Sequence, residues 1–224
     1  MKCGVLGLIR LAMARHATPF GPGRQGVYRS STKEFTMVEF AIHTIDSAPA
    51  GSRPLLEGIG RSFGFVPNLF RVFAESPAAL RGALAIYEAF STSSLSPAEQ
   101  QLVMLAVSEA NDCEYCVAAH STLAKRMAKV APGLVDAVRR RAPLADGKLD
   151  ALANFTRKIV EQRGLVADAE VAAFLDAGYT RAQVIEVLLG VGMKTFNNYV
   201  DHIAHTPLND QFKAEAWQPK RKVA

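Results

Sequence analysis

Two cysteines and one histidine form the cluster in this sequence whose residue types and spacing best suit a defined chemistry. Cys113, Cys116 and His120 stand at positions i, i+3 and i+7. A helix turns by about 100° per residue, so this spacing places the three side chains on one helix face. A thiolate near a histidine is an activated nucleophile, and a second thiol one turn away can close a disulfide with it. The cluster therefore contains the parts of a thiol redox cycle: a nucleophile, a base and a resolving thiol.

The residues next to the cysteines indicate how a helix could activate them. Asn111 and Asp112 interrupt the preceding apolar pattern, and either can cap a helix that begins at the cysteines. The unpaired N–H groups and the dipole at a helix N-terminus favour negative charge. We therefore expect a cysteine in this first turn to have a pKa below the value of about 8.5 for a free cysteine. Tyr115 is expected to pack with its hydroxyl in water.

A metal site is the main alternative interpretation of these residues. Cys113, Cys116 and His120 supply three possible ligands, and His202 or His205 could supply a fourth. The sequence has no second C-x-x-C pair, and the spacing differs from that of common zinc fingers, so we expect no metal and no cofactor. We expect both distal histidines to be structural. A thioredoxin-like fold would place the cysteine pair after a strand, and no such pattern is present.

Helical signals recur along most of the sequence. Helix starts are expected at Ser52-Pro54, Phe65, Ser76-Pro77, the capping box Ser96-Pro97-Ala98-Glu99, Pro132 and Thr180, with a long helix near 149–160 and helix stops at Gly164 and Gly178. The last helix is apolar on almost every side, so we expect it in the core or at a subunit contact. No window alternates as a strand does between hairpin turns. The sequence thus predicts an all-α protein.

The positive charge of the chain lies outside its helical part. Residues 1–36 hold six Lys or Arg and one Glu, which accounts for the whole net charge of +5. The rest is neutral overall, so we expect no nucleic-acid partner. No stretch of about 18 uncharged apolar residues is present, so we expect no membrane partner. Three cysteines, two of them forming the reactive pair, are typical of a reducing compartment and favour a cytoplasmic location.

Composition divides the chain into three parts. Residues 1–36 mix Gly, Pro and charge without a helical period and are expected to be a disordered extension. This segment has some features of a signal peptide and of an organellar transit peptide, and it can also be an extension upstream of a start at Met37. Residues 37–213 are expected to form the helical domain, and residues 214–224 a basic tail.

The segments around the cysteines resemble a known family. The stretch from Glu99 through Cys113 and Cys116 to His120 is similar to the core motif of the carboxymuconolactone decarboxylase superfamily, in its AhpD-like alkylhydroperoxidase branch. Residues 64–70 and 198–208 resemble the peroxidase-related subgroup of that branch. The resemblance spans roughly residues 40–210, and the cysteine motif is its most specific part.

This resemblance implies an AhpD-like helical bundle that assembles into homo-oligomers, as dimers, trimers or hexamers. It also implies an oxidoreductase, an antioxidant peroxidase that reduces a hydroperoxide substrate with electrons from a dithiol donor. In the family's scheme Cys116 attacks the peroxide and becomes a sulfenic acid, and Cys113 then condenses with it to give a redox-active disulfide. His120 corresponds to the histidine of the proton relay.

The sequence departs from the family at one position of that relay. The family uses a glutamate twelve residues before the first cysteine, and Gln101 stands there. A glutamine accepts no proton at neutral pH. Either His120 works without a carboxylate, or Gln101 orients a water, or another acid such as Asp112 or Glu114 takes its place.

Several classes of function stay open from the sequence alone. The first is the thiol-dependent peroxidase. The second is a metal-binding helical protein, and the third is a redox-sensing module whose disulfide switches a partner interface without turnover. A weaker enzyme alternative is the superfamily's lactone decarboxylase chemistry, which does not rely on a C-x-x-C pair.

Overall fold

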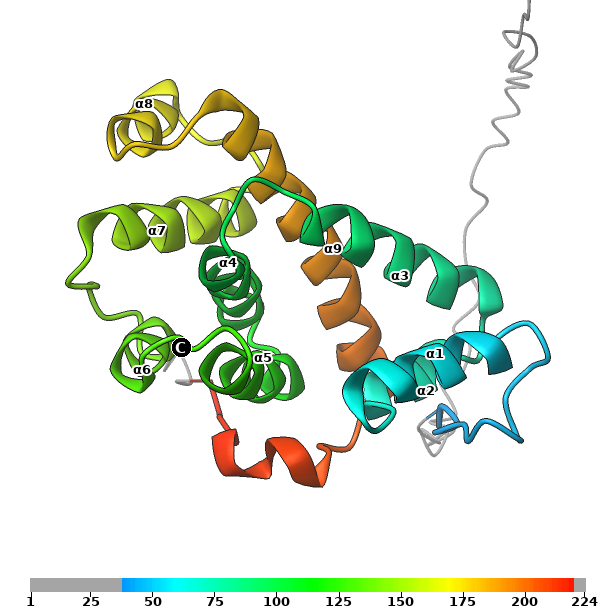
Figure 1. Ribbon diagram of the computed structural model, residues 1–224. Helices are drawn as coiled ribbons and strands as arrows, with labels where there is room; N and C mark the ends of the chain where they lie inside the picture. Colours follow the sequence, from blue (N-terminus) through cyan, green and yellow to red (C-terminus); the bar gives the residue numbers. More distant parts are fainter. Residues whose placement is uncertain (1–37, 220–224) are drawn as a thin grey trace, which may run out of the picture. The chain divides into compact units, whose positions relative to one another are not determined.

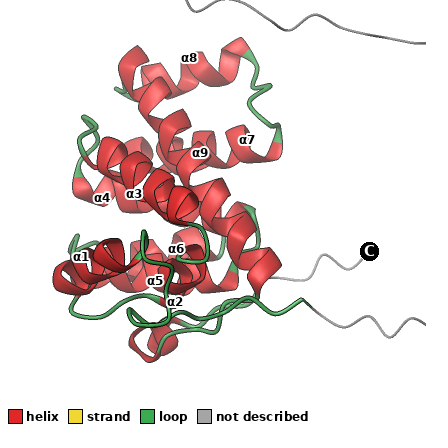
Figure 2. Cartoon of the chain, turned by 90° about the vertical axis from the view of Figure 1, so that its right-hand side faces the viewer, coloured by secondary structure: helices red, strands yellow, loops and turns green. Residues whose placement is uncertain are grey.

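The computed structural model describes residues 38–219, and within this range every regular element is a helix (Figures 1 and 2). In chain order the elements are α1 (Arg53–Phe63), α2 (Asn68–Phe73), α3 (Pro77–Ser91), α4 (Pro97–Ala110), α5 (Glu114–Arg126), α6 (Pro132–Arg139), α7 (Gly147–Glu161), α8 (Asp168–Asp176), α9 (Arg181–Ala204) and the 3₁₀ helix η1 (Asp210–Glu215). The all-α prediction is confirmed. The expected extension 1–36 lies outside the described residues. None of the described helices has the length and apolar character needed to cross a membrane.

Short polar side chains set the starts of three long helices. The Ser76 hydroxyl accepts a backbone N–H at the start of α3, and Thr180 does the same for α9. Ser96 and Glu99 form a complete capping box at the start of α4, each side chain accepting the other's backbone N–H. These three predicted starts are confirmed.

Other helix boundaries differ in part from the sequence prediction. Ser52 precedes α1, but its side chain makes no cap; instead its buried hydroxyl donates to the carbonyl of Ala74 at 2.8 Å, which ties α1 to the end of α2. The short helix expected at Phe65 begins at Asn68. Gly164 and Gly178, with φ of 80° and 96°, stop α7 and α8 as predicted.

Helix α4 lies at the centre of the bundle (Figure 1). It is buried along most of its length and packs against α5, α6, α7 and α9. One apolar cluster surrounds α4 and α7 and contains the stacked rings of Phe155, Phe174 and Tyr179. A second cluster joins α1, α2, α3 and α5 and contains both Cys113 and Cys116. The start of α5 is therefore enclosed by core on several sides.

Helix α9 buries several polar side chains in the protein core and exposes many apolar side chains on the surface. Its buried face includes Lys194, Asn197, Asn198 and Asp201, which follow one another at helical spacing. Its outer face exposes apolar side chains, namely Ile185, Leu188, Leu189, Phe196, Tyr199 and Ile203. The sequence predicted a helix that is apolar on almost every side. The structure shows that several of its polar residues form a stripe on the buried face.

The close approach of α9 to α3 and α4 requires a glycine. A Cβ at Gly190 would lie 2.7 and 2.8 Å from ring carbons of Phe90 and 2.9 Å from a methyl of Val103. These contacts are shorter than packed carbon atoms tolerate, and neighbouring α3 and α4 would have to move. We expect Gly190→Ala to lower the free energy of unfolding by about 1–3 kcal/mol.

Gly192, on the same helix, is the matched control for this substitution. A Cβ at Gly192 meets nothing within 4 Å, so Gly192→Ala is expected to stabilise the helix by up to about 1 kcal/mol. Thermal or urea unfolding of the two variants measures both effects. If Gly190→Ala unfolded no more easily than Gly192→Ala, this account of helix packing would be wrong.

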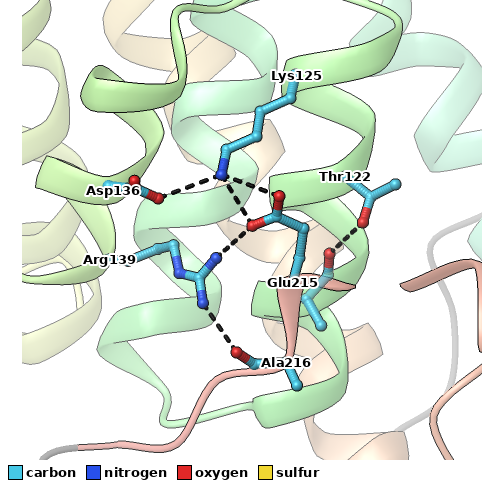
Figure 3. Close-up of polar contacts among 7 residues, drawn as sticks. Thr122, Lys125, Asp136, Arg139, Glu215 and Ala216 are labelled. Carbon is cyan, nitrogen blue, oxygen red and sulfur yellow. Dashed lines mark hydrogen bonds and ion pairs between the residues drawn. The ribbon is translucent and has the colours of Figure 1, made fainter. Parts of the chain in front are cut away.

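An ion cluster fastens η1 to the helices beneath it (Figure 3). The Glu215 carboxylate accepts hydrogen bonds from Lys125 of α5 at 2.9 Å and from Arg139 of α6 at 2.6 Å. One turn earlier on the same side of η1 is Phe212, whose buried ring meets Tyr115 edge-on at 5.9 Å between ring centroids. These ion pairs of Glu215, the Glu215 clamp, hold the Phe212 side chain against α5, the helix of the two cysteines. Glu215 lies beyond residue 213, the expected limit of the domain.

Candidate active site

Cys113 itself is the N-cap residue of α5. It has extended backbone angles, and no side chain caps the helix. The expected cap by Asn111 or Asp112 is therefore wrong: the Asn111 amide donates to Asn198 of α9 at 3.0 Å, and Asp112 is exposed with a left-handed φ of 54°. Cys116 lies in the first turn of α5, as predicted, where free backbone N–H groups favour a thiolate.

The environments of the two thiols differ. Both are free thiols and both are completely buried. Burial raises the pKa of Cys116, but hydrogen bonding from Cys113 and the charge of Lys194 outweigh it and lower the pKa to about 7. Burial, together with the neighbouring Cys116 and Asp201, raises the pKa of Cys113 well above its ordinary value. Cys116 is thus the thiol suited to be the nucleophile at neutral pH.

Lys194 is a candidate site residue that the sequence analysis missed. It comes from the middle of α9, is 2% exposed, and forms no salt bridge with any residue in 38–219. A buried lysine is rare and costly unless its charge has a use. Its signal in the sequence was a single lysine within the apolar run from Val184 to Phe196.

Asp201, two turns further along α9, also reaches the thiols. Its Oδ2 accepts a hydrogen bond from the Sγ of Cys113 at 3.2 Å. Lys194 and Asp201 lie on the same helix face because seven residues make two turns. The buried polar stripe of α9 thus supplies a cation near Cys116 and a carboxylate near Cys113.

The relay position Gln101 contacts the His120 ring directly. The Oε1 of Gln101 lies 3.0 Å from Nδ1 of His120. An amide oxygen can only accept, so Nδ1 carries the proton and Nε2 keeps its lone pair. Burial and the charge of Lys194 hold the pKa of His120 well below its ordinary value, so the ring is neutral at pH 7. Gln101 therefore orients the histidine.

The Gln101→Glu substitution is expected to raise the pKa of His120, because a carboxylate beside Nδ1 stabilises the imidazolium. The imidazolium would favour the Cys116 thiolate and speed its oxidation near pH 6 by roughly tenfold. An NMR titration of the His120 ring measures the pKa, and single-turnover kinetics measure the rate. In the control Gln101→Leu, Nδ1 loses its acceptor and the rate is expected to fall. An unchanged His120 pKa in Gln101→Glu would contradict the contact.

The other acids considered for the relay lie elsewhere. Asp112 and Glu114 are exposed. Glu99, two residues before Gln101 at the start of α4, is occupied by other partners: it accepts from the Ser96 backbone N–H and from the Tyr179 hydroxyl. None of the three replaces the family's glutamate.

The residues of the metal alternative do not come together. His202 and His205 are exposed, whereas both cysteines are completely buried. Within residues 38–219 no group of three or more His, Cys, Asp or Glu side chains is arranged to hold a metal ion.

A small cavity of about 50 Å³ lies beside His120 and Lys194, and neither Cys113 nor Cys116 is among its lining residues. Its polar groups are His120, Lys194 and Asn197, and the Asn197 Oδ1 is buried without a hydrogen-bond partner within the described residues. The remaining walls are mostly apolar and aromatic: Phe63, Pro67, Leu69, Phe70, Tyr87, Met104, Tyr115, Ala119, Leu123, Met193 and Phe212. The cavity therefore offers two groups able to exchange protons within an otherwise apolar enclosure.

Tyr115 forms part of the cavity wall, and its hydroxyl is held by protein groups. The expectation of a hydroxyl in water is wrong, because the group donates to Oδ1 of Asn209 at 2.7 Å and accepts the N–H of Leu69 at 3.3 Å. Burial raises the pKa of Tyr115. The side chain thus joins α2, α5 and the segment before η1.

A family model matches the part of the chain that contains this site. Residues 73–158, which include α4, α5 and both cysteines, match the model of the carboxymuconolactone decarboxylase family. No curated protein sequence gives a significant match.

Three solved structures have a similar fold. A peroxidase-related protein with an alkylhydroperoxidase AhpD core, from Ralstonia eutropha JMP134, aligns with a TM-score of 0.70 and 23% identity over 79% of this chain and 94% of that one. A peroxidase-related protein from Silicibacter sp. TM1040 aligns with a TM-score of 0.68 and 21% identity, over 82% and 97%. The debrominase Bmp8, in complex with 2,3,4-tribromopyrrole, gives a TM-score of 0.68 and 14% identity, over 81% and 96%. The chain therefore matches the carboxymuconolactone decarboxylase family model over residues 73–158, and it has the fold of these AhpD-like structures.

Proposed function

We propose that this protein is a thiol-dependent peroxidase that works through a Cys113–Cys116 dithiol–disulfide cycle. One arrangement carries the proposal: the completely buried Cys116 lies in the first turn of α5, where the neighbouring Cys113 thiol and the charge of Lys194 lower its pKa. A buried thiol without a function has a raised pKa. The lowered value means that the surroundings favour the reactive thiolate.

The first half of the proposed cycle oxidises Cys116. Its thiolate attacks the terminal peroxide oxygen, the O–O bond breaks, and the sulfenic acid of Cys116 and an alkoxide form. The alkoxide takes up the proton that the Cys116 thiol gave up. His120 can relay that proton through Nε2, the nitrogen not bonded to Gln101, and the ammonium of Lys194 stabilises the departing oxygen.

The second half of the cycle restores the thiols. The Cys113 sulfur attacks the sulfenic sulfur, a disulfide forms and water leaves. An external dithiol then reduces this disulfide and is itself oxidised to a disulfide. The proposal places the protein in a reducing compartment as a homo-oligomer, and the exposed apolar side chains of α9 support self-association.

Reductive dehalogenation is a second candidate, favoured by the aromatic walls of the cavity. Phe63, Phe70 and Tyr87 suit an apolar ring, and the debrominase with this fold holds a brominated pyrrole. The Cys116 thiolate would attack bromine and give a sulfenyl bromide, while the ring carbon takes a proton. Cys113 would then displace bromide, forming the same disulfide and releasing one proton.

Thiol counting on the pure reduced protein tests the proposal. One equivalent of cumene hydroperoxide is expected to consume two of the three thiols, and mass spectrometry should locate a Cys113–Cys116 disulfide. Dithiothreitol should then sustain repeated turnover. Oxidation without turnover would indicate a redox sensor, and unchanged thiols would exclude the cycle. Reaction with 2,3,4-tribromopyrrole, followed by bromide release, distinguishes the second candidate.

A further inference from the structure

Asp201 makes a contact that the proposed cycle has not yet used. Its Oδ2 lies 3.2 Å from the Sγ of Cys113 and accepts the thiol hydrogen. Its other oxygen, Oδ1, is buried and has no hydrogen-bond partner within the described residues. Burying a carboxylate with one oxygen unpaired is costly. The hydrogen bond places Asp201 where it can receive the proton of the Cys113 thiol.

The Cys113 proton has two neighbouring acceptors and can be donated to one at a time. Before oxidation it stabilises the Cys116 thiolate, and this hydrogen bonding is one cause of the low Cys116 pKa. Once Cys116 is a neutral sulfenic acid, its sulfur accepts the hydrogen bond from the Cys113 thiol much more weakly than a thiolate does. The remaining acceptor is Asp201, on the opposite helix α9.

We propose that Asp201 is the general base of the disulfide-forming step, an inference that rests on the proposed peroxidase cycle. As the Cys113 sulfur forms its bond to the Cys116 sulfur, the thiol proton moves to Asp201 Oδ2. The S–O bond of the sulfenic acid breaks, and the departing hydroxide takes up a proton and leaves as water. One proton has thus moved from Cys113 to Asp201 and one proton has joined the hydroxide. When Asp201 gives its proton back, the step has released one water with no net change in charge.

The neighbouring groups cannot take this role. Lys194 is a donor and holds no lone pair while charged. His120 keeps Nδ1 bonded to Gln101 and lines the cavity, and within residues 38–219 the hydrogen bond of the Cys113 thiol goes to Asp201 and not to His120. A free Cys113 thiolate beside the Asp201 carboxylate is disfavoured by repulsion. The proton must therefore leave during the attack, and not before it.

The Asp201→Asn variant separates this role from a purely electrostatic one. Without the base, conversion of the sulfenic acid to the disulfide is expected to slow by about a hundredfold, while formation of the sulfenic acid continues. If the carboxylate acted only by its charge, its removal would ease ionisation of Cys113 and speed the same step. The two accounts predict opposite signs, and an equal or faster rate would overturn the proposal.

Single-turnover experiments with one equivalent of cumene hydroperoxide make this measurement. Dimedone traps the sulfenic acid at timed intervals, and mass spectrometry quantifies trapped protein and disulfide. Asp201→Glu keeps a carboxylate and should recover part of the rate. Within residues 38–219 the buried Asn198 side chain of α9 bonds only to Asn111 and Ser108, so Asn198→Ala controls for a loosened helix and should leave the step unchanged.

A measurement on the unaltered chain covers the case in which Asp201→Asn does not fold. Because a proton moves in the disulfide-forming step, that step is expected to slow in deuterium oxide at its pH-independent plateau. An equal rate in both solvents would contradict the proposal. If the unaltered chain forms neither trapped sulfenic acid nor disulfide, the peroxidase cycle fails and not merely the role of Asp201.

Discussion

The Cys116→Ser variant is expected to consume no hydroperoxide. Serine keeps the shape of the side chain, but its hydroxyl does not ionise near neutral pH, so the lysine beside it has no anion to stabilise. Peroxide-dependent oxidation of a dithiol should fall to the rate measured without protein. A coupled assay with dithiothreitol as donor and cumene hydroperoxide as substrate measures this loss.

Two further serine variants serve as controls for that result. Cys113→Ser is expected to react once and stop as a Cys116 sulfenic acid, because the resolving thiol is missing. Cys3→Ser makes the same change at the third cysteine and should keep full activity. If Cys116→Ser kept steady-state turnover while remaining folded by circular dichroism, Cys116 would not be the nucleophile.

Replacing Lys194 with methionine is expected to slow the oxidation of Cys116. The charge of Lys194 helps to hold the pKa of Cys116 at about 7, against the burial that raises it. Without this charge the pKa of Cys116 rises, the thiolate becomes scarce at pH 7, and the oxidation rate falls by roughly ten- to a hundredfold. The loss should shrink above pH 9, so the midpoint of the pH–rate profile moves upward.

Stability separates this effect from simple damage to the fold. Lys194 is buried and has no ion pair within residues 38–219, and methionine fills a similar volume without a charge to desolvate. We therefore expect an equal or higher melting temperature for Lys194→Met. Lys158→Met removes an exposed partner of Glu170 and serves as the matched control, with an unchanged pH profile. An unshifted profile in Lys194→Met would remove this lysine from the mechanism.

Local signals in the sequence predicted the starts of several helices correctly. The caps at Ser76, Ser96 and Thr180 act through hydrogen bonds three residues along the chain, so their effect is visible in the sequence itself. Placing Cys116 in a first helix turn was correct for the same reason. Asn111 misled the cap prediction because a tertiary contact to Asn198 takes up its amide.

The polar half of the site depended on packing that the sequence did not reveal. Lys194 and Asp201 lie on α9, and only the packing of α9 against α4 and α2 brings them to the cysteines. The sequence shows that Lys194 and Asp201 are two helical turns apart. An amphipathic pattern, however, predicts that the polar face of a helix is exposed, and in α9 the polar face is buried. Gln101 was identified as a relay position, but its contact with the histidine ring required the crossing of α4 and α5.

The clamp on η1 has a consequence for the order in which this protein acquires its reactivity. During synthesis the cysteines of α5 emerge before α9, which brings Lys194 and Asp201, and before η1, which brings Phe212 and the Glu215 clamp. Until those segments arrive, Cys116 is an ordinary thiol exposed to solvent, with few thiolates at neutral pH. Nascent chains are therefore expected to react sluggishly with oxidants, and the sulfur becomes a potent nucleophile only as it is enclosed.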